Sequence, residues 1–274
     1  MIEIISDSTA CLEKDFIKKN KIHIVPMKYS FGNKEFKEGL PPFKKFYLTL
    51  KKAKELPKTS QPSINDFLSI YEKIIKEGNT AIVFTLSSKV SGTFESALKA
   101  KEQCSKPESI FVPDFLLIGQ LTKALIEEAI FLIKKRKTPK TIISSLLQIR
   151  DEKLEGFFLP DTLEYLHKGG RISKLSLMAG NILKIKPILS FSDGEIKCVS
   201  KIIGEKKTLE TFFNKIPKNF EKLYYIRIGE SENFSKLEKY LKENFSDKVL
   251  EYGEVGPTLG SHIGKGIGLV WRNF

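Results

Sequence analysis

The sequence predicts a two-part α/β protein, with a parallel sheet in the N-terminal part and an α+β part with a mixed or antiparallel sheet after it. In the first half, short strand-like segments alternate with segments of helical length, an order typical of parallel strands joined by helices. In the second half this alternation is lost, and Ser192-Asp193-Gly194 has the composition of a hairpin turn. A chain of 274 residues is also long for a single core. We therefore expect one domain over residues 1–153 and a second over 154–274.

The N-terminal part begins with a strand whose β-branched residues alternate with polar ones. Ser63 and Asp66 have capping-box spacing, so Ser63 is interpreted as structural. Strands are predicted at 2–6, 22–29, 80–85 and 109–113, and helices from Ala10 to about Asn20 and over 42–54, 64–77, 119–135 and 139–150, with one more following the turn after 85 and continuing to about 103.

The C-terminal part has shorter segments and more turns. Strands are predicted at 156–159, 187–192, 195–203, 223–229, 248–254 and 268–271, and helices at 162–167, 175–183, 206–215 and 232–244. The segment 256–264 is rich in glycine, so we expect it to be a loop.

The composition excludes several classes of protein. No apolar run reaches the roughly 18 to 20 residues of a membrane span. The amino terminus lacks the basic region of a signal peptide, and three widely spaced cysteines have no metal-ligand spacing. These features predict a cytoplasmic protein.

The net charge of +13 raises the question of nucleic-acid binding. Only five of the 46 basic residues are arginines, and the lysines are scattered over predicted helix faces. Nucleic-acid-binding proteins usually cluster their basic residues and favour arginine for gripping phosphate. We therefore expect no nucleic-acid partner and a solvated lysine coat, which leaves open contact with an acidic partner or an anionic membrane surface. A steep salt dependence of binding would mark this alternative.

The stretch 84–97 carries the first indication of a ligand. A buried strand runs into a Ser/Gly turn, and the turn opens a helix. Hydroxyls and free N–H groups at such a junction favour an anion. The alternative is that Ser91 only caps the helix.

Three other polar loops accompany it: Asp7-Ser8-Thr9, Thr59-Ser60-Gln61 and Ser261-His262. Asp7-Ser8-Thr9 and the 84–97 turn should share the carboxyl edge of the parallel sheet. The sequence has no cluster of metal ligands, phosphate-binding lysine loop or dinucleotide fingerprint, so we expect no metal and no cofactor. Neutral hydroxyls and amides are suited to holding an anion without attacking it.

A hydrolase that uses Ser91 and His262 is the alternative function. The residues around Ser91 lack the pattern of a nucleophile elbow, and no acid is evident for His262. Esterase activity lost on Ser91→Ala would favour this alternative.

The sequence resembles the DegV family, the fatty-acid-binding subunits of bacterial fatty acid kinase, over nearly its whole length. The resemblance rests on stretches in the family's order: Ser6-Asp7-Ser8-Thr9-Ala10, Thr59-Ser60-Gln61-Pro62-Ser63, Ser87-Ser88 with Ser91-Gly92-Thr93, Leu163-Glu164-Tyr165-Leu166 with Gly169-Gly170-Arg171-Ile172, Lys186-Pro187-Ile188-Leu189, and Gly256-Pro257 with His262-Ile263-Gly264.

The resemblance implies a carrier that does no chemistry alone. A long-chain fatty acid would lie in a tunnel between the two domains, and a separate kinase subunit would phosphorylate its carboxylate to an acyl phosphate for phospholipid synthesis. A transient acyltransferase or membrane-surface contact would follow. Arg171 would face the kinase or the phosphate. The residues expected to bind the carboxylate are Thr59, Ser60, Ser91, Gly92, Thr93 and His262.

The expected tunnel wall is apolar, although most of its members are also typical core residues. It comprises Phe94, Leu116, Leu117, Ile118, Leu121, Leu159, Leu163, Leu166, Met178, Ile182, Ile188 and Ile267. Two departures from the family stand nearby. The segment 115–118 is more apolar than in relatives, and Lys265 replaces a common proline, which puts a positive charge near the expected mouth of the tunnel.

Overall fold

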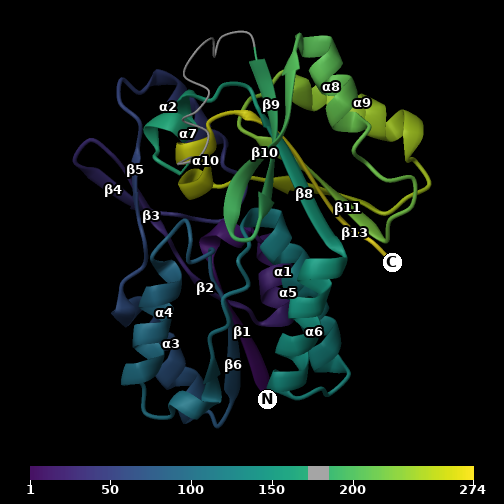
Figure 1. Ribbon diagram of the computed structural model, residues 1–274. Coiled ribbons are helices and arrows are strands. Elements are labelled where there is room, and N and C mark those ends of the chain that lie inside the picture. Colours follow the sequence, from purple (N-terminus) through teal and green to yellow (C-terminus); the bar gives the residue numbers. More distant parts are fainter. Residues whose placement is uncertain (172–184) are drawn as a thin grey trace.

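The computed structural model describes residues 1–171 and 185–274, which contain three sheets (Figure 1). The first sheet has four parallel strands in the order β2-β1-β6-β7. The second has six strands in the order β10-β9-β8-β13-β11-β12, antiparallel except for the pair β11 and β12. The third is a small antiparallel sheet in the order β4-β3-β5.

The strand bounds are β1 (Ile2–Asp7), β2 (His23–Val25), β3 (Lys28–Phe31), β4 (Lys34–Lys37), β5 (Lys58–Ser60), β6 (Thr80–Phe84), β7 (Ile110–Phe111), β8 (Leu154–Pro160), β9 (Ile185–Ser192), β10 (Glu195–Ile203), β11 (Lys222–Ile228), β12 (Leu250–Glu254) and β13 (Gly266–Arg272). The helices are α1 (Lys14–Asn20), α2 (Lys44–Lys52), α3 (Ile64–Lys76), α4 (Thr93–Gln103), α5 (Gly119–Lys134), α6 (Pro139–Glu152), α7 (Glu164–Lys168), α8 (Glu205–Phe213), α9 (Asn233–Asn244) and α10 (Pro257–Ile263), with 3-10 turns at Ser8–Ala10 and Pro107–Ser109.

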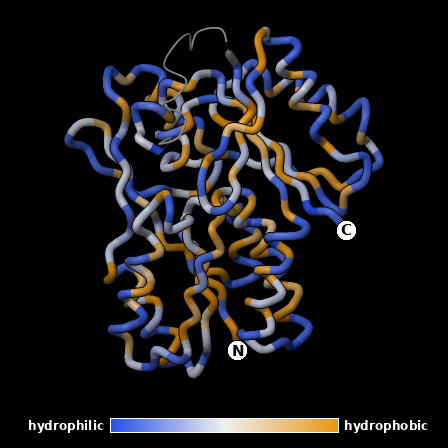
Figure 2. Tube along the Cα trace, in the orientation of Figure 1, coloured by the Kyte–Doolittle hydropathy of each residue, from blue (hydrophilic) through white to orange (hydrophobic). Residues whose placement is uncertain are grey.

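The parallel sheet is buried on both faces because helices cover each of them. Along β6, Ala81 and Val83 join the core cluster under α3 and α4, whereas Ile82 and Phe84 join the cluster that includes α5 and α6. Successive strand residues point to opposite faces, so a strand covered on both sides is a continuous apolar run. Figure 2 shows this hydrophobic concentration along the central strands.

The six-stranded sheet also has a hydrophobic core on each of its faces. Leu269 and Trp271 of β13 pack under α8 and α9, and Val270 between them packs into the cluster that contains α5. Helix α5 therefore lies between the two large sheets. The predicted fold class, a parallel-sheet domain followed by a mixed-sheet domain, is confirmed.

Partly buried ion pairs connect α5 to the second sheet. Lys123 of α5 is 1% exposed and pairs with Glu13, at 2.6 Å, and with Glu251 of β12. Lys222 of β11 pairs with Glu127 of α5 at 2.7 Å. Breaking one partner of such a pair leaves an uncompensated buried charge, which is strongly destabilising.

Several local predictions differ from the structure. The expected strand at 22–29 is two strands, β2 and β3, interrupted at Pro26, which has no N–H to donate to a ladder. The segment 256–264, expected as a loop, contains helix α10 with Pro257 at its first position. Strands β4 and β5 were not predicted. The helix expected at 175–183 lies outside the described residues.

Candidate functional site

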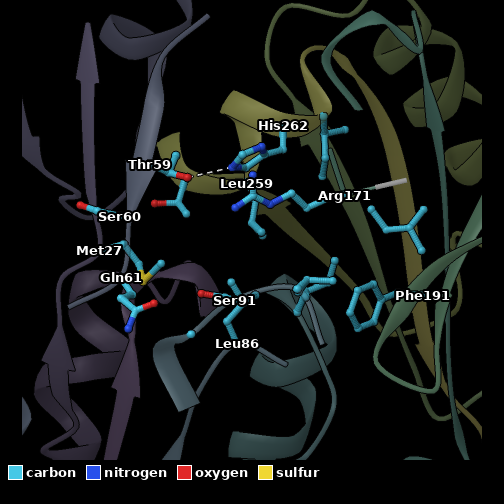
Figure 3. A pocket seen from close by; sticks show the side chains of 16 residues that line it. Met27, Thr59, Ser60, Gln61, Leu86, Ser91, Arg171, Phe191, Leu259 and His262 are labelled. Carbon is cyan, nitrogen blue, oxygen red and sulfur yellow. Dashed lines mark hydrogen bonds between the residues drawn. The ribbon is translucent and has the colours of Figure 1, made fainter. Parts of the chain in front are cut away.

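A cavity of about 330 Å³ lies where the parallel sheet, the small sheet, α10 and the β9–β10 hairpin meet (Figure 3). Figure 3 shows Thr59 and His262 on one side, Ser91 across from them, and Phe191 at the far end. The walls are formed by Met27, Thr59, Ser60, Gln61, Leu86, Val90, Ser91, Gly92, Ile118, Arg171, Phe191, Ile196, Thr258, Leu259, His262 and Ile263.

Asp7, at the end of β1, holds the turn after β6 in place through hydrogen bonds. One carboxylate oxygen of Asp7 accepts from the N–H of Leu86 at 2.5 Å, and the other accepts from the N–H and hydroxyl of Thr9 at 2.9 and 2.5 Å. Asp7 is 1% exposed, and burial raises the pKa of its carboxyl group. Asp7 is therefore a support for the site and does not face a ligand.

Two polar residues in that turn, Ser91 and Thr93, lie on either side of a glycine. The hydroxyls of Ser91 and Thr93 lie 2.9 Å apart, and the Ser91 oxygen accepts from the N–H of Thr93 at 3.3 Å. Gly92, and not Ser91, is the N-cap of α4, and it has no side-chain cap. A Cβ on Gly92 would lie 2.0 Å from the Gln61 side-chain oxygen, so a larger residue here would displace the Gln61 amide. Thr93 is buried behind the pocket wall.

His262 supplies the opposite wall. Its Nε2 lies 2.8 Å from the hydroxyl of Thr59 on β5, which joins α10 to the small sheet. Burial, reinforced by the nearby charge of Arg171, lowers the pKa of His262 to about 4. The ring is therefore neutral near pH 7, with one N–H donor and one acceptor nitrogen. A Cβ on Gly169 would lie 2.6 Å from Nδ1, so the other side of the ring is closely packed.

Helix α10 is held in place by a carboxylate distant in sequence. Glu38 is 3% exposed and accepts from the N–H and hydroxyl of Thr258 at 3.0 and 2.8 Å, and from the Ser8 hydroxyl at 2.6 Å. Burial raises its pKa. Because Glu38 accepts both donors of Thr258 at the amino end of α10, His262 is the polar side chain that this helix leaves to the pocket.

The mouth of the pocket is basic. Arg171 is exposed, donates to the Gly169 carbonyl at 2.6 Å, and lines both the pocket and an adjoining groove of about 680 Å³. Thr59 and His262 are likewise common to both cavities. Lys54, Lys58 and Lys168 also line this groove, together with Glu55 and Glu164.

The interior of the pocket is apolar. Beyond Leu86, Val90 and Ile196 it adjoins a smaller cavity of about 60 Å³. The two cavities share four apolar walls, namely Ile118, Phe191, Leu259 and Ile263. Polar groups at one end and apolar walls at the other suit an amphiphile with a small anionic head and a hydrocarbon tail.

A model of the DegV family, whose members it describes as uncharacterised, matches residues 1–273. The chain belongs to the DegV family. It is 36% identical to a DegV domain-containing protein of Clostridium acetobutylicum and 30% identical to protein DegV of Bacillus subtilis, in each case over 98% of both chains. The resemblance predicted from the six motifs is therefore confirmed.

Solved DegV structures have the same fold. The Bacillus subtilis DegV, described as a fatty acid binding protein, aligns with a TM-score of 0.85 at 28% identity, covering 100% of this chain and 99% of that one. A DegV lipid-binding protein from Thermotoga maritima aligns with a TM-score of 0.84 at 27% identity, covering 99% and 98%.

Five of the six residues expected to bind a carboxylate line the pocket of this DegV protein, and Thr93 lies directly behind it. Of the expected tunnel residues, Ile118 and Leu121 line the two cavities. The others lie elsewhere: Leu117, Leu163 and Leu166 in or against the main core, Phe94 and Leu116 partly buried outside the walls, Leu159, Ile188 and Ile267 in the cluster under α8 and α9, and Met178 and Ile182 outside the described residues.

Lys265, expected near the mouth, is exposed and lies against Gly229, away from the walls of the pocket and of the basic groove. Leu116 of the apolar segment contacts the hairpin tip, where a Cβ on Gly194 would lie 2.8 Å from its Cδ2. Within this segment, Ile118 therefore lines the pocket and Leu116 packs beside the tip of the β9–β10 hairpin.

Sequence reasoning missed several wall residues, chiefly from the hairpin and α10: Met27, Leu86, Val90, Phe191, Ile196, Thr258, Leu259 and Ile263. Gln61 belongs to one of the six motifs of the family resemblance, but nothing in the sequence indicates that its side chain lies against Gly92.

The geometry does not favour the hydrolase alternative. The hydrogen-bond partner of His262 Nε2 is Thr59, whereas the Ser91 hydroxyl pairs with Thr93. In the described part of the chain no carboxylate contacts the ring of His262, and no group of three or more His, Cys, Asp and Glu residues is placed to hold a metal. None of the described helices is long and apolar enough to cross a membrane.

Proposed function

We propose that this DegV protein binds a long-chain fatty acid, with the carboxylate between Thr59, Ser91 and His262 and the chain in the apolar cavities. The observation that carries the proposal is the division of one pocket into a hydroxyl and imidazole end and an apolar end. DegV relatives of more than 25% identity are described as lipid-binding and fatty-acid-binding proteins.

The energetics are consistent with such a ligand. Burial of 14 to 16 methylenes contributes roughly 12 kcal/mol at about 0.8 kcal/mol each, before the large costs of association. A desolvated carboxylate requires several hydrogen bonds. Thr59, Ser91, the neutral His262 and the amide of Gly92 line the pocket and can supply donors.

We further propose that a separate kinase acts on the bound acid. A carboxylate oxygen would attack the terminal phosphorus of ATP, and ADP would leave, which gives an acyl phosphate for phospholipid synthesis in the cytoplasm. The exposed Arg171, which lines both the pocket and the groove, and the basic groove that adjoins the carboxylate site support this role, because a phosphoryl donor in the groove would be next to Thr59 and His262. In this scheme the protein is not an enzyme by itself and needs no cofactor.

A comparison of two ligands of equal length tests the binding proposal. Hexadecanoic acid and hexadecanol are titrated against the wild-type protein and against Thr59→Val and Ser91→Ala. We expect the wild type to prefer the acid, and each variant to lose most of that preference while its affinity for the alcohol changes little. Equal binding of both ligands by the wild type would refute the assigned carboxylate site.

The kinase proposal needs its own test. The protein loaded with fatty acid is incubated with ATP and lysate from a DegV-containing bacterium, and acyl phosphate is trapped with hydroxylamine. Arg171→Ala should retain fatty acid but form less hydroxamate. Undiminished hydroxamate in that variant would contradict the role of Arg171.

A further inference from the structure

The smaller cavity beyond the pocket is apolar except at one residue. It is bounded by α5, the inner face of the six-stranded sheet and α10, and it shares Ile118, Phe191, Leu259 and Ile263 with the pocket. Among the described residues that line it, Gln120 is the one with a polar side chain. A fatty acid whose carboxylate lies at His262 and whose chain continues past the shared walls would reach Gln120.

The amide of Gln120 is held in one orientation. Its Nε2 donates to the carbonyl of Glu254 at 3.4 Å, and a Cβ on Gly253 would lie 2.8 Å from its Cδ and Nε2, so the amide is pressed against β12. Reversing the amide would place its oxygen against a carbonyl oxygen that has no proton to donate.

The side-chain oxygen of Gln120 has no donor in the part of the chain that the structure describes, although the residue is only 3% exposed. A buried acceptor without a partner costs about 1 to 3 kcal/mol. Thr85, Thr122 and Trp271 also carry an unpartnered buried atom, but none of them lines this cavity.

Water is a poor partner for this oxygen. A buried water needs two to four polar neighbours, and apolar cavities stay dry. The remaining side chains around this cavity are aliphatic or aromatic, or absent at glycine. A donor carried by the ligand itself satisfies the oxygen without adding an unpaired group.

We propose that this cavity selects a fatty acid that bears a hydroxyl group on the distal part of its chain, with the O–H donating to the Gln120 oxygen. The inference rests on the proposed fatty-acid function and specifies its substrate class. A keto or epoxy group only accepts hydrogen bonds and would face Gln120 as a second unpaired acceptor. An ammonium group is excluded by the cost of burying its charge.

The test is a competition series at fixed chain length. Octadecanoic acid is compared with its monohydroxy isomers, substituted at successive positions from carbon 10 to the terminus, and with the keto acid matching the best isomer. We expect one position, or two adjacent ones, to bind about tenfold tighter than octadecanoic acid, as one satisfied hydrogen bond supplies. The matching keto acid should bind no tighter than octadecanoic acid.

Two variants assign the preference to a residue. Gln120→Met keeps a similar length without the amide, and the ratio of hydroxy-acid to plain-acid affinity should fall to about one. Thr122→Val is the matched control, because it removes another unpartnered buried oxygen of α5 that does not line the cavity, and the ratio should be unchanged.

The proposal is overturned if no isomer exceeds octadecanoic acid in the wild type, or if the preference survives in Gln120→Met. If Gln120→Met does not fold, the wild-type position scan and the keto comparison decide the matter alone. Binding of octadecanoic acid without any hydroxyl preference refutes only this inference, whereas failure to bind any of the acids refutes the proposed function as well.

Discussion

Two groups of polar side chains, one buried and one partly buried, lie close together at the carboxyl edge of the parallel sheet, and they differ in how their hydrogen bonds are satisfied. Asp7 and Glu38 each accept three hydrogen bonds from protein donors. Thr59, Ser91 and His262 instead pair with single neutral partners at the pocket wall. The fully bonded carboxylates support the scaffold, whereas the singly paired groups can exchange their partner for a ligand oxygen.

The largest expected effect is the loss of stability when one of the fully bonded carboxylates is removed. Glu38→Ala leaves the donors of Ser8 and Thr258 without a partner, so the free energy of unfolding should fall by about 3 kcal/mol. Urea denaturation measures this free energy of unfolding. Glu35→Ala is the control, because this residue is 62% exposed with one ion pair at 3.7 Å, and it should cost less than about 0.5 kcal/mol. If both variants lost a similar free energy of unfolding, Glu38 would not differ from an exposed carboxylate in its support of the scaffold.

Gly92→Ala tests the turn that connects the carboxylate-supported scaffold to the ligand-side residue Ser91. The added Cβ would lie 2.0 Å from the Gln61 side-chain oxygen, so either Gln61 or the Ser91–Thr93 turn has to move. We expect fatty-acid affinity to fall about thirtyfold in calorimetric titration, as misplaced donors cost about 2 kcal/mol. Gly39→Ala serves as the matched variant, since a Cβ there meets nothing within 4 Å. Unchanged affinity in Gly92→Ala would show that the turn does not contact the ligand.

Thr59→Val removes one hydroxyl from the ligand side while keeping the side-chain shape. Affinity for hexadecanoic acid should fall about tenfold, because one hydrogen bond to the carboxylate and the partner of His262 are lost. Thr49→Val provides the comparison, since Thr49 is exposed and its hydroxyl donates to the Lys45 carbonyl within α2. If Thr59→Val lowered thermal stability but not affinity, Thr59 would belong with the scaffold.

The smallest effect concerns protonation. Burial lowers the pKa of His262 from 6.5 to about 4, so between these values the unfolded chain binds a proton that the folded ligand-free protein does not. This contribution to stability is present above pH 6.5 and is lost as the pH falls. His262→Gln should therefore abolish about 1 kcal/mol of the stability difference between pH 6.5 and about 5.5. Identical pH profiles for the two proteins would contradict a neutral, buried imidazole.

The sequence predicted best those features that depend on neighbouring residues. Ser63 and Asp66 form the expected capping box, with both reciprocal hydrogen bonds present. Strands β1 and β6 pair in parallel and bring the loops after Asp7 and Phe84 to one edge, as expected.

Features that depend on distant contacts could not be predicted. The segment 256–264 was expected to be a loop because it is rich in glycine, a poor helix former, yet it contains α10, and Glu38, 220 residues away from Thr258, accepts from the N–H of Thr258 in its first turn. Glu38 lies in a Lys- and Glu-rich stretch that gives no sign of burial. Similarly, residues 58–60 become strand β5 only because β3 pairs with them, and this pairing brings Thr59 to His262.

Mass spectrometry of an organic extract from protein purified without added lipid tests directly whether the chain carries a fatty acid. We expect one long-chain fatty acid per chain, lost from Thr59→Val before it is lost from Thr49→Val on washing with a lipid acceptor. A hydroxylated acid in the extract would also support the role of Gln120. Wild-type protein that contains no fatty acid and takes none up from added hexadecanoic acid would contradict the account.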